Sequence, residues 1–280
     1  MVLNQDALYY ERMASSVGDK ARLLPFVHGT KVLEIGFGGG EVLDMLHEQG
    51  YEVYGLDASD VSTGKVADKP YGKNVVEAYA DEISQHWSQG YFDTIIISST
   101  LHEVFSYGNR NAKNKHSLES IISTIKEIHD ALAPGGRILL RDGVLATNWD
   151  TKTKILMKNG DSEGVENYLA LQPFKDRVSL TATDKDTFIG TLESVAALAY
   201  TYTWGAKALP RESQELFGLL TLAEYSALIE RIGFTVIHNE EYVQQGYIDN
   251  LGPKMELTDL DGNSMDFPPT NAIWIGEKPA

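Results

Sequence analysis

The chain has 280 residues, of which 42% are hydrophobic and 23% are charged, which is the composition of an ordinary globular protein. Asp and Glu number 40 against 24 Lys and Arg, so the formal net charge is −16. A chain this acidic repels polyanions, and we expect no general binding to nucleic acids. The sequence has no cysteine, which excludes disulfides, thiolate metal sites and cysteine nucleophiles.

The first ten residues, MVLNQDALYY, contain neither a basic segment nor an apolar run, so we expect no secretory signal. No apolar run in the sequence approaches about 18 residues, the length that is needed to span a membrane. We therefore expect a cytoplasmic protein without a membrane partner.

In chain order, the first expected element is a helix at 6–28, within an N-terminal helical cap at 1–30. The run KVLEI at 31–35 is short, apolar and followed by glycines, as is typical of a buried parallel strand. A helix at 40–50 follows, and Gly50 ends it.

The later strands are short apolar runs, expected at 51–57, 74–80, 91–99, 137–144, 234–240 and 271–277. Leu and Ile recur at helical spacing through 117–132, a helix that the APGG segment after it should stop. A further helix is expected at 221–232, where Thr221 and Glu224 form a capping box. Strands that alternate with helices indicate a parallel sheet with right-handed crossovers.

Residues 145–220 interrupt this alternation and are rich in aromatic side chains. We predict that they form a largely helical insertion, a lid and substrate-binding region over the carboxyl edge of the sheet. The aromatic residues either form the core of this insertion or wall a planar substrate. The whole chain is interpreted as one domain with a core at 31–144, the insertion at 145–220, and a last part at 221–280. That last part holds a helix, strands six and seven, and a hairpin at 255–267.

Four glycines stand among residues 36–40, between the first strand and the helix after it. A glycine-rich turn at this place lets a nucleotide cofactor touch the backbone, and the first amides of the helix face the ligand. The dinucleotide fingerprint requires Gly or Ala at its sixth position, which is Glu41 here. This residue argues against an NAD-dependent oxidoreductase.

The segment VLEIGFGGG resembles motif I of the class I S-adenosylmethionine-dependent methyltransferases, an acidic residue followed by Gly-x-Gly-x-Gly. Glu34, Gly36, Gly38 and Gly40 match this motif. GLDAS at 55–59, YADEIS at 79–84, FDTIIISSTLHEV at 92–104 and LAPGGRILLRD at 132–142 resemble the family's later motifs in the same order. The resemblance covers residues 31–142 well and extends through the last two strands to 277.

The resemblance implies a Rossmann-like α/β fold, a seven-stranded mostly parallel sheet with helices on both faces, and S-adenosylmethionine as cofactor. Asp57 would take the ribose hydroxyls, and Asp81 would meet the adenine amino group or else cap the next helix. The cofactor carries a sulfonium and an ammonium beside one carboxylate, so acidic residues suit it. The implied cofactor-binding residues are Glu34, Gly36, Phe37, Gly38, Gly40, Asp57, Ala58, Asp81, Glu82 and Ser98.

Polar residues at the carboxyl ends of strands four and five are the predicted catalytic residues, namely His102, Glu103 and Arg141. His102 is the expected general base, because the ordinary pKa of histidine lies near neutrality; the alternative is that it only packs against the cofactor or a loop. Glu103 stands where related enzymes often carry a second histidine. Arg141, beside Asp142, is expected either to bind an anionic substrate group or to pair with a nearby acid.

The leading interpretation is methyl transfer to an O or N atom of a small molecule. One alternative is a nucleotide, RNA or protein target that meets the basic loop at 109–116, with Arg110, Lys113, Lys115 and His116. Another is a non-catalytic module that binds S-adenosylmethionine. The chain lacks the Asn/Asp-Pro-Pro-Tyr/Phe motif of DNA amino-methylation and the aspartate of magnesium-dependent catechol enzymes, so we expect no metal.

Overall fold

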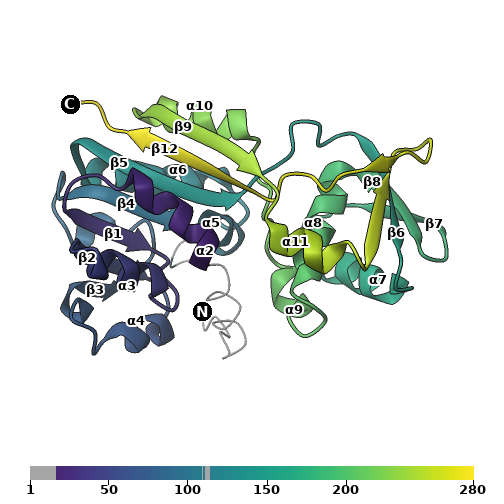
Figure 1. Ribbon diagram of the computed structural model, residues 1–280, viewed down its shortest axis with the longest axis horizontal. Coiled ribbons are helices and arrows are strands. Elements are labelled where there is room, and N and C mark those ends of the chain that lie inside the picture. The colour runs from purple at the N-terminus through teal and green to yellow at the C-terminus, as the bar shows by residue number, and fades with distance from the viewer. Residues whose placement is uncertain (1–16, 109, 111–113) are drawn as a thin grey trace. The chain divides into compact units, whose positions relative to one another are not determined.

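The computed structural model of the protein describes residues 17–108, 110 and 114–280 (Figure 1). The chain divides into two compact units. The first unit runs to Asp142 and also contains Ser226–Asn239 and Ile273–Ala280, and the second contains Gly143–Tyr225 and Glu240–Ala272. The second unit therefore includes the predicted insertion together with residues near the C-terminus.

A seven-stranded sheet forms the centre of the fold, in the order β3-β2-β1-β4-β5-β12-β9. Strands β1 to β5 pair with one another in parallel. This confirms the predicted α/β fold with a mostly parallel sheet. The strands are β1 (Lys31–Ile35), β2 (Glu52–Asp57), β3 (Val75–Glu77), β4 (Phe92–Ser98), β5 (Leu132–Gly143), β9 (Thr235–Tyr242) and β12 (Asn271–Glu277).

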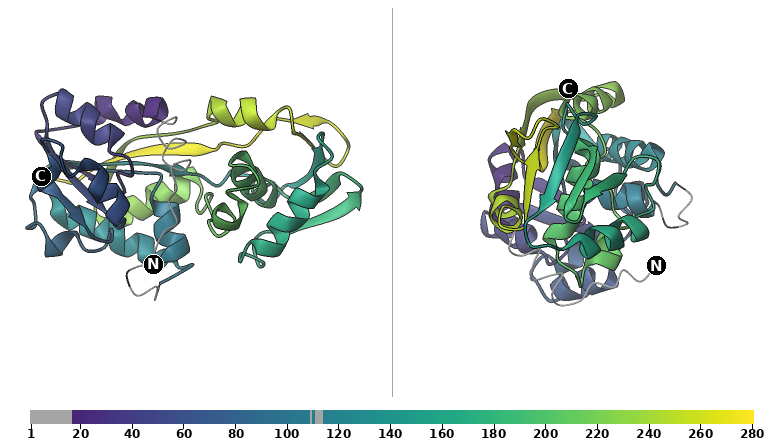
Figure 2. Two further views of the ribbon diagram at one scale, coloured as in Figure 1. Left: turned by 90° about the horizontal axis from the view of Figure 1, so that it is seen from below. Right: turned by 90° about the vertical axis from the view of Figure 1, so that its right-hand side faces the viewer.

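Helices lie on both faces of this sheet (Figure 2). In α6, three isoleucines at helical spacing, Ile121, Ile125 and Ile128, are fully buried, and Ser117 caps the helix by accepting from the N–H of Glu119. The helices are α2 (Val17–Lys20), α3 (Glu41–Glu48), α4 (Asp60–Val66), α5 (Leu101–Tyr107), α6 (Leu118–Ala131) and α10 (Leu222–Ile232), with short 3-10 helices η1 (Ala21–Phe26), η2 (Gly72–Asn74) and η3 (Ile83–Gln85).

Two element boundaries differ from the prediction. The described part of the expected helix at 6–28 is a single α-helical turn followed by the 3-10 helix η1, which contains Pro25. Proline has no backbone N–H to continue an α-helix. Strand β5 begins at Leu132 and includes the APGG segment, which we expected to separate a helix from a strand. A register shift in its pairing with β4, between Phe92 and Thr94, accommodates this segment.

Strand β4 is buried on both faces, and its carboxyl end lies at the edge of the sheet where the predicted site residues follow. Ile95, Ile96 and Ile97 are at most 1% exposed, as expected for a parallel strand covered on both faces. Because β1, β2, β4 and β5 are parallel, their carboxyl ends meet at one edge. The segments that follow these strands, including the glycine loop at 36–40, are thus brought together at that edge.

The second unit contains a five-stranded sheet in the order β11-β10-β6-β8-β7, with antiparallel pairing. The insertion that we predicted to be largely helical therefore also contains three strands. In β6, Thr153, Ile155 and Met157 are buried in alternation, but their partner β10 lies about a hundred residues further along the chain. These elements are β6 (Lys152–Met157), α7 (Ser162–Leu171), β7 (Leu180–Asp184), β8 (Thr187–Thr191), α8 (Leu192–Thr203), α9 (Leu209–Glu212), α11 (Gln245–Leu251), β10 (Met255–Thr258) and β11 (Ser264–Met265).

Strands β10 and β11 pair where the hairpin at 255–267 was expected, and the turn between them holds Asp261 and Gly262. Within the described part of the chain, no helix is long and apolar enough to cross a membrane.

Candidate functional site

The glycine loop passes close to the start of α5. Gly36 has a φ of +69°, and a Cβ atom built on it would lie 2.3 Å from the Oγ1 atom of Thr100. Gly38 and Gly40 also have positive φ values, 57° and 87°, and Gly40 is the N-cap of α3. These conformations cost a residue with a side chain more than they cost glycine. The glycines of the predicted motif I therefore stand where the backbone of this loop needs positive φ values.

Asp57, at the end of β2, fixes this loop. Its Oδ2 atom accepts a hydrogen bond of 2.9 Å from the N–H of Gly38, and its Oδ1 atom accepts one of 2.9 Å from the N–H of Ser59. Burial raises the pKa of the Asp57 carboxyl to about 6, and these two hydrogen bonds act against the rise. The Ser62 side chain gives Asp57 a third hydrogen bond, and a carboxylate has about four acceptor sites, so a ligand hydroxyl can still bind.

Glu34 is a buried carboxyl group with one oxygen unused. It is 2% exposed, and its Oε2 atom has no hydrogen-bond partner among the described residues. Burial raises the pKa of Glu34 to about 8, the charge of Lys20 lowers it, and the charges of Glu41 and Asp57 raise it further. A buried acceptor without a partner is rare in folded proteins and points to a ligand that supplies a donor.

Strand register places several polar residues on the same face of the sheet as Glu34. Glu34 pairs with Gly55 in β2 and with Ile96 in β4. Residues two positions further along a strand point to the same face, so Asp57 and Ser98 share the face of Glu34. Ser98 is 2% exposed, and its Oγ atom also has no partner within the described chain. Three predicted cofactor residues thus converge on one face.

Lys20, in α2, joins this group and was not among the residues that the sequence predicted. It is 4% exposed, and burial lowers the pKa of its ammonium, whereas the nearby charge of Glu34 raises it. The electrostatic interaction between Lys20 and Glu34 joins the helical turn α2 to the first strand. No local pattern in the sequence signals that these two charges lie close enough to affect each other's pKa.

Two other predicted cofactor residues have different surroundings. The ring of Phe37 is buried against Gly55, where a Cβ atom would lie 3.0 Å from the ring, so its side chain belongs to the core. Ala58 is exposed. Only the backbone of Phe37 is available to a ligand, and the roles of both residues stay predictions.

Asp81 lies half-buried in the turn after β3. The N-cap of the next helix, η3, is Glu82 and not Asp81, so the alternative role of Asp81 as a helix cap is wrong. Glu82 accepts two hydrogen bonds from the guanidinium of Arg110, at 2.9 and 2.8 Å, and one from the N–H of Tyr79. The pairing with Arg110 is the main reason that the pKa of Glu82 is lowered. Its role as a cofactor residue stays a prediction.

Arg110 is the part of the predicted basic loop that makes this contact, and its guanidinium also lies 4.9 Å from the centre of the Tyr79 ring. Lys113 lies outside the described residues. Lys115 and His116 are exposed, and burial together with the charge of Lys115 lowers the pKa of His116. One cation of the loop is therefore already paired with an acid.

Arg141, a predicted catalytic residue, is held by ion pairing. It is 2% exposed, and its guanidinium donates to the carboxylate of Asp19, with 2.6 Å between Nε and Oδ2. Its Nη1 atom donates to the Oγ atom of Ser99 at 2.6 Å. Ser99 has a φ of +55°, an uncommon value for a residue with a side chain. Of the two roles expected for Arg141, the structure shows the pairing with a nearby acid.

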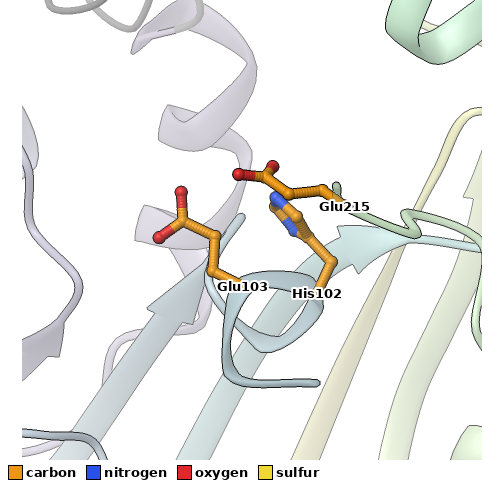
Figure 3. A group of neighbouring side chains, drawn as sticks. All are labelled: His102, Glu103 and Glu215. Atoms are coloured by element: carbon orange, nitrogen blue, oxygen red, sulfur yellow. The ribbon is translucent and has the colours of Figure 1, made fainter. Parts of the chain in front are cut away.

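His102 and Glu103 lie in the first turn of α5, and their side chains rise from it in Figure 3. The Nδ1 atom of His102 lies 2.6 Å from the Oδ1 atom of Asp142. The sequence pointed to Asp142 beside Arg141 at the end of strand five, but not to its contact with His102. A carboxylate oxygen of Glu103 and a ring nitrogen of His102 lie within 4.8 Å of each other. The predicted catalytic positions of α5 are thus adjacent, and an acid of β5 contacts the imidazole.

Comparison with known proteins places these features in context. The profile of a family described as "Methyltransferase domain" matches residues 9–239. An uncharacterised methyltransferase of Synechocystis is 32% identical over 121 residues, 43% of this chain and 50% of the relative. One of Geobacillus kaustophilus is 30% identical over 133 residues, 48% of this chain and 53% of the relative. The matched part of the chain thus spans about half the length of these curated relatives.

Solved structures show the same fold. A SAM-dependent methyltransferase from Archaeoglobus fulgidus superposes with a TM-score of 0.54 at 14% identity and covers 94% of both chains. A S-adenosylmethionine-dependent methyltransferase from Mesorhizobium loti gives a TM-score of 0.54 at 16% identity, over 94% of this chain and 98% of that one. At such low identity the similarity concerns the fold alone.

Proposed function

The chain belongs to the methyltransferase domain family, and from this premise we propose that it transfers the methyl group of S-adenosylmethionine to an oxygen or nitrogen atom of a small molecule. The membership confirms the resemblance to class I S-adenosylmethionine-dependent methyltransferases that motif I indicated. S-adenosylmethionine is the cofactor of that family. The acceptor and the residues that bind it are our own assignments.

The observation that carries the proposal is the unused oxygen of Glu34. It is buried beside the glycine loop, on the same sheet face as Asp57 and Ser98. A buried carboxyl oxygen without a partner favours a ligand with N–H or O–H donors, and a positive charge on that ligand would lower the raised pKa of Glu34 and favour its ionised form. S-adenosylmethionine carries a sulfonium, an ammonium and two ribose hydroxyls, and the residues present fit it.

In this proposal the backbone of Gly36, Gly38 and Gly40 approaches the cofactor. Glu34 receives a donor of the ligand, and Asp57 accepts from the ribose hydroxyls while it holds the N–H of Gly38. Asp81 meets the adenine amino group, and Ser98 supplies a further polar contact. These roles support binding and place the methyl group at the carboxyl edge of the sheet.

His102 is assigned as the general base. When bound, S-adenosylmethionine supplies a methyl group already activated by the sulfonium. The protein then mainly has to bring the acceptor atom close and in line with it, a proximity effect. An acceptor that still holds its proton loses it to the imidazole of His102, whose ordinary pKa lies near neutrality.

The small-molecule acceptor is supported by the net charge of −16, which repels nucleic acids. In the basic loop of the alternative proposal, Arg110 already pairs with Glu82, so its positive charge is partly neutralised towards a nucleic acid. A nucleic-acid acceptor would bind with an affinity that falls steeply as salt rises, and a neutral small molecule would not.

The proposal is tested by incubating the protein with methyl-labelled S-adenosylmethionine and a panel of phenols, amines and nitrogen heterocycles. We expect a labelled product and one equivalent of S-adenosylhomocysteine. His102→Ala should retain cofactor binding and lose about 10²–10⁴-fold in turnover, the usual range for an acid–base group. His47→Ala, at an exposed histidine of α3, is the control. Binding of cofactor without any labelled product would favour the non-catalytic module.

A further inference from the structure

Asp142 connects the end of β5 to the start of α5. Its Oδ2 atom accepts from the backbone N–H groups of Thr100, Leu101 and His102, at 3.1, 2.7 and 3.3 Å. Its Oδ1 atom lies 2.6 Å from the Nδ1 atom of His102. The side chains of His102 and Asp142 are only 7% and 3% exposed, so water does not replace these contacts.

These contacts decide which nitrogen of the imidazole carries the proton. Three backbone donors that converge on Oδ2 favour the ionised carboxylate of Asp142. An ionised carboxylate has no proton to donate, so the hydrogen bond between Oδ1 and Nδ1 requires that Nδ1 carries the hydrogen. In the neutral imidazole, Nε2 then holds the lone pair and is the atom that can accept a proton.

We infer that Asp142 is a positioning residue for the proposed methyl transfer: it holds His102 in the Nδ1–H tautomer, so that Nε2 accepts the proton of the methyl acceptor. The inference rests on the proposed role of His102 as base. In the reaction the acceptor's lone pair forms the bond to the methyl carbon. The carbon–sulfur bond breaks with its electron pair on sulfur, and the acceptor's proton passes to Nε2. The carboxylate of Asp142 then faces the imidazolium.

A purely structural role for Asp142, as the cap of α5, would need only the contacts of its Oδ2 atom. The Oδ2 atom alone satisfies the first N–H groups of α5, which have no partner within the helix. The second contact, at 2.6 Å to Nδ1, adds nothing to that cap and instead orients the imidazole. The arrangement follows the general pattern in which a catalytic base is oriented by a buried acceptor at its other nitrogen.

The test substitutes Asp142→Asn, which keeps the size of the side chain. The amide oxygen can take the place of Oδ2 and retain the helix cap, while the amide nitrogen faces Nδ1 and donates to it. His102 is then forced into the Nε2–H tautomer. We expect ¹⁵N NMR of histidine-labelled protein, at a pH where His102 is neutral, to show the proton on Nδ1 in the wild type and on Nε2 in the variant.

Kinetics separate positioning from folding. We expect Asp142→Asn to lower kcat by about 10²–10⁴-fold, similar to His102→Ala, with the affinity for S-adenosylhomocysteine unchanged. In the background of His102→Ala, the same substitution should cause no further loss, because both changes remove one function. Additive losses would overturn the inference.

The spectrum of the wild type needs no variant, so it remains decisive if Asp142→Asn fails to fold. A wild-type His102 with its proton on Nε2 would overturn the inference even if the protein transfers methyl groups. Conversely, the Nδ1–H tautomer in a protein without any methyl transfer would leave the positioning contact intact and contradict the proposed function.

Discussion

The carboxylate of Asp57 holds the backbone of Gly38 through a hydrogen bond of 2.9 Å between Oδ2 and the N–H group. This contact joins the end of β2 to the glycine loop after β1. The sequence resemblance assigned Asp57 to the cofactor, and the structure adds that the same side chain fixes the loop. Loss of Asp57 is therefore expected to act on the ligand both directly and through the loop.

Asp57→Ala should weaken binding of S-adenosylhomocysteine by about 1.5–3 kcal/mol, the scale of hydrogen bonds to a charged group. Isothermal titration calorimetry measures the effect. Asp60→Ala, at an exposed acid of α4, is the matched control and should bind as the wild type does. Equal affinities of the two variants would mean that Asp57 contributes only to the fold.

Gly36→Ala should destabilise the protein more than Gly50→Ala does. Both glycines have positive φ values, +69° and +89°, and share a conformational cost of about 1–2 kcal/mol for alanine. At Gly36 the new Cβ atom would in addition lie 2.3 Å from Thr100 Oγ1, whereas at Gly50 nothing lies within 4 Å. Overpacking adds about 1–3 kcal/mol, which urea denaturation can resolve. Equal losses would mean that Thr100 moves aside freely.

Glu34 and Asp57 should make the free energy of unfolding fall as pH rises. Burial raises the pKa of Glu34 from 4.5 to about 8 and that of Asp57 from 3.8 to about 6. Between the ordinary and the raised value, the folded state binds more protons than the unfolded state. Stability therefore decreases with rising pH in these windows.

Glu34→Gln removes the larger of these two contributions, so the variant should gain stability relative to the wild type as pH rises from 4.5 towards 8. Urea denaturation at both ends of this range measures the difference. Glu48→Gln, at an exposed acid of α3, should follow the wild type at both values. A constant difference between Glu34→Gln and the wild type would show that Glu34 titrates normally.

Asp19→Ala should cost about 3–5 kcal/mol of stability, because it removes an acid that pairs with the buried guanidinium of Arg141. Lys69→Ala breaks an exposed pair with Asp44 and should cost only about 0–1 kcal/mol. Thermal or urea denaturation compares the two. A small effect of Asp19→Ala would mean that the ion pair contributes little to stability, and it would favour the other role expected for Arg141, binding of an anionic substrate group.

Local sequence patterns predicted much of the first unit. The apolar runs of β1 and β4, the glycine loop and the acid at Glu34 are encoded in short segments, and each was placed correctly in the fold. His102 was likewise expected beside the carboxyl end of β4, and the structure places it in α5, which begins three residues after that strand ends.

Partners that are distant along the chain were not predictable in this way. Asp19 meets Arg141 across 122 positions, and Asp142 meets His102 across 40. The strands of the second unit were missed for the same reason, since β6 is completed by β10. Periodicity reports which face of an element is buried, but it does not report which distant side chain lies against it.

Calorimetric titration of the wild-type protein with S-adenosylhomocysteine, and separately with NAD, tests the central claim most directly. We predict one binding site for S-adenosylhomocysteine and no detectable binding of NAD, because the acids Glu41 and Asp57, whose charges act on Glu34, disfavour a pyrophosphate. Binding of NAD together with a failure to bind S-adenosylhomocysteine would contradict the assignment of this site to methyl transfer.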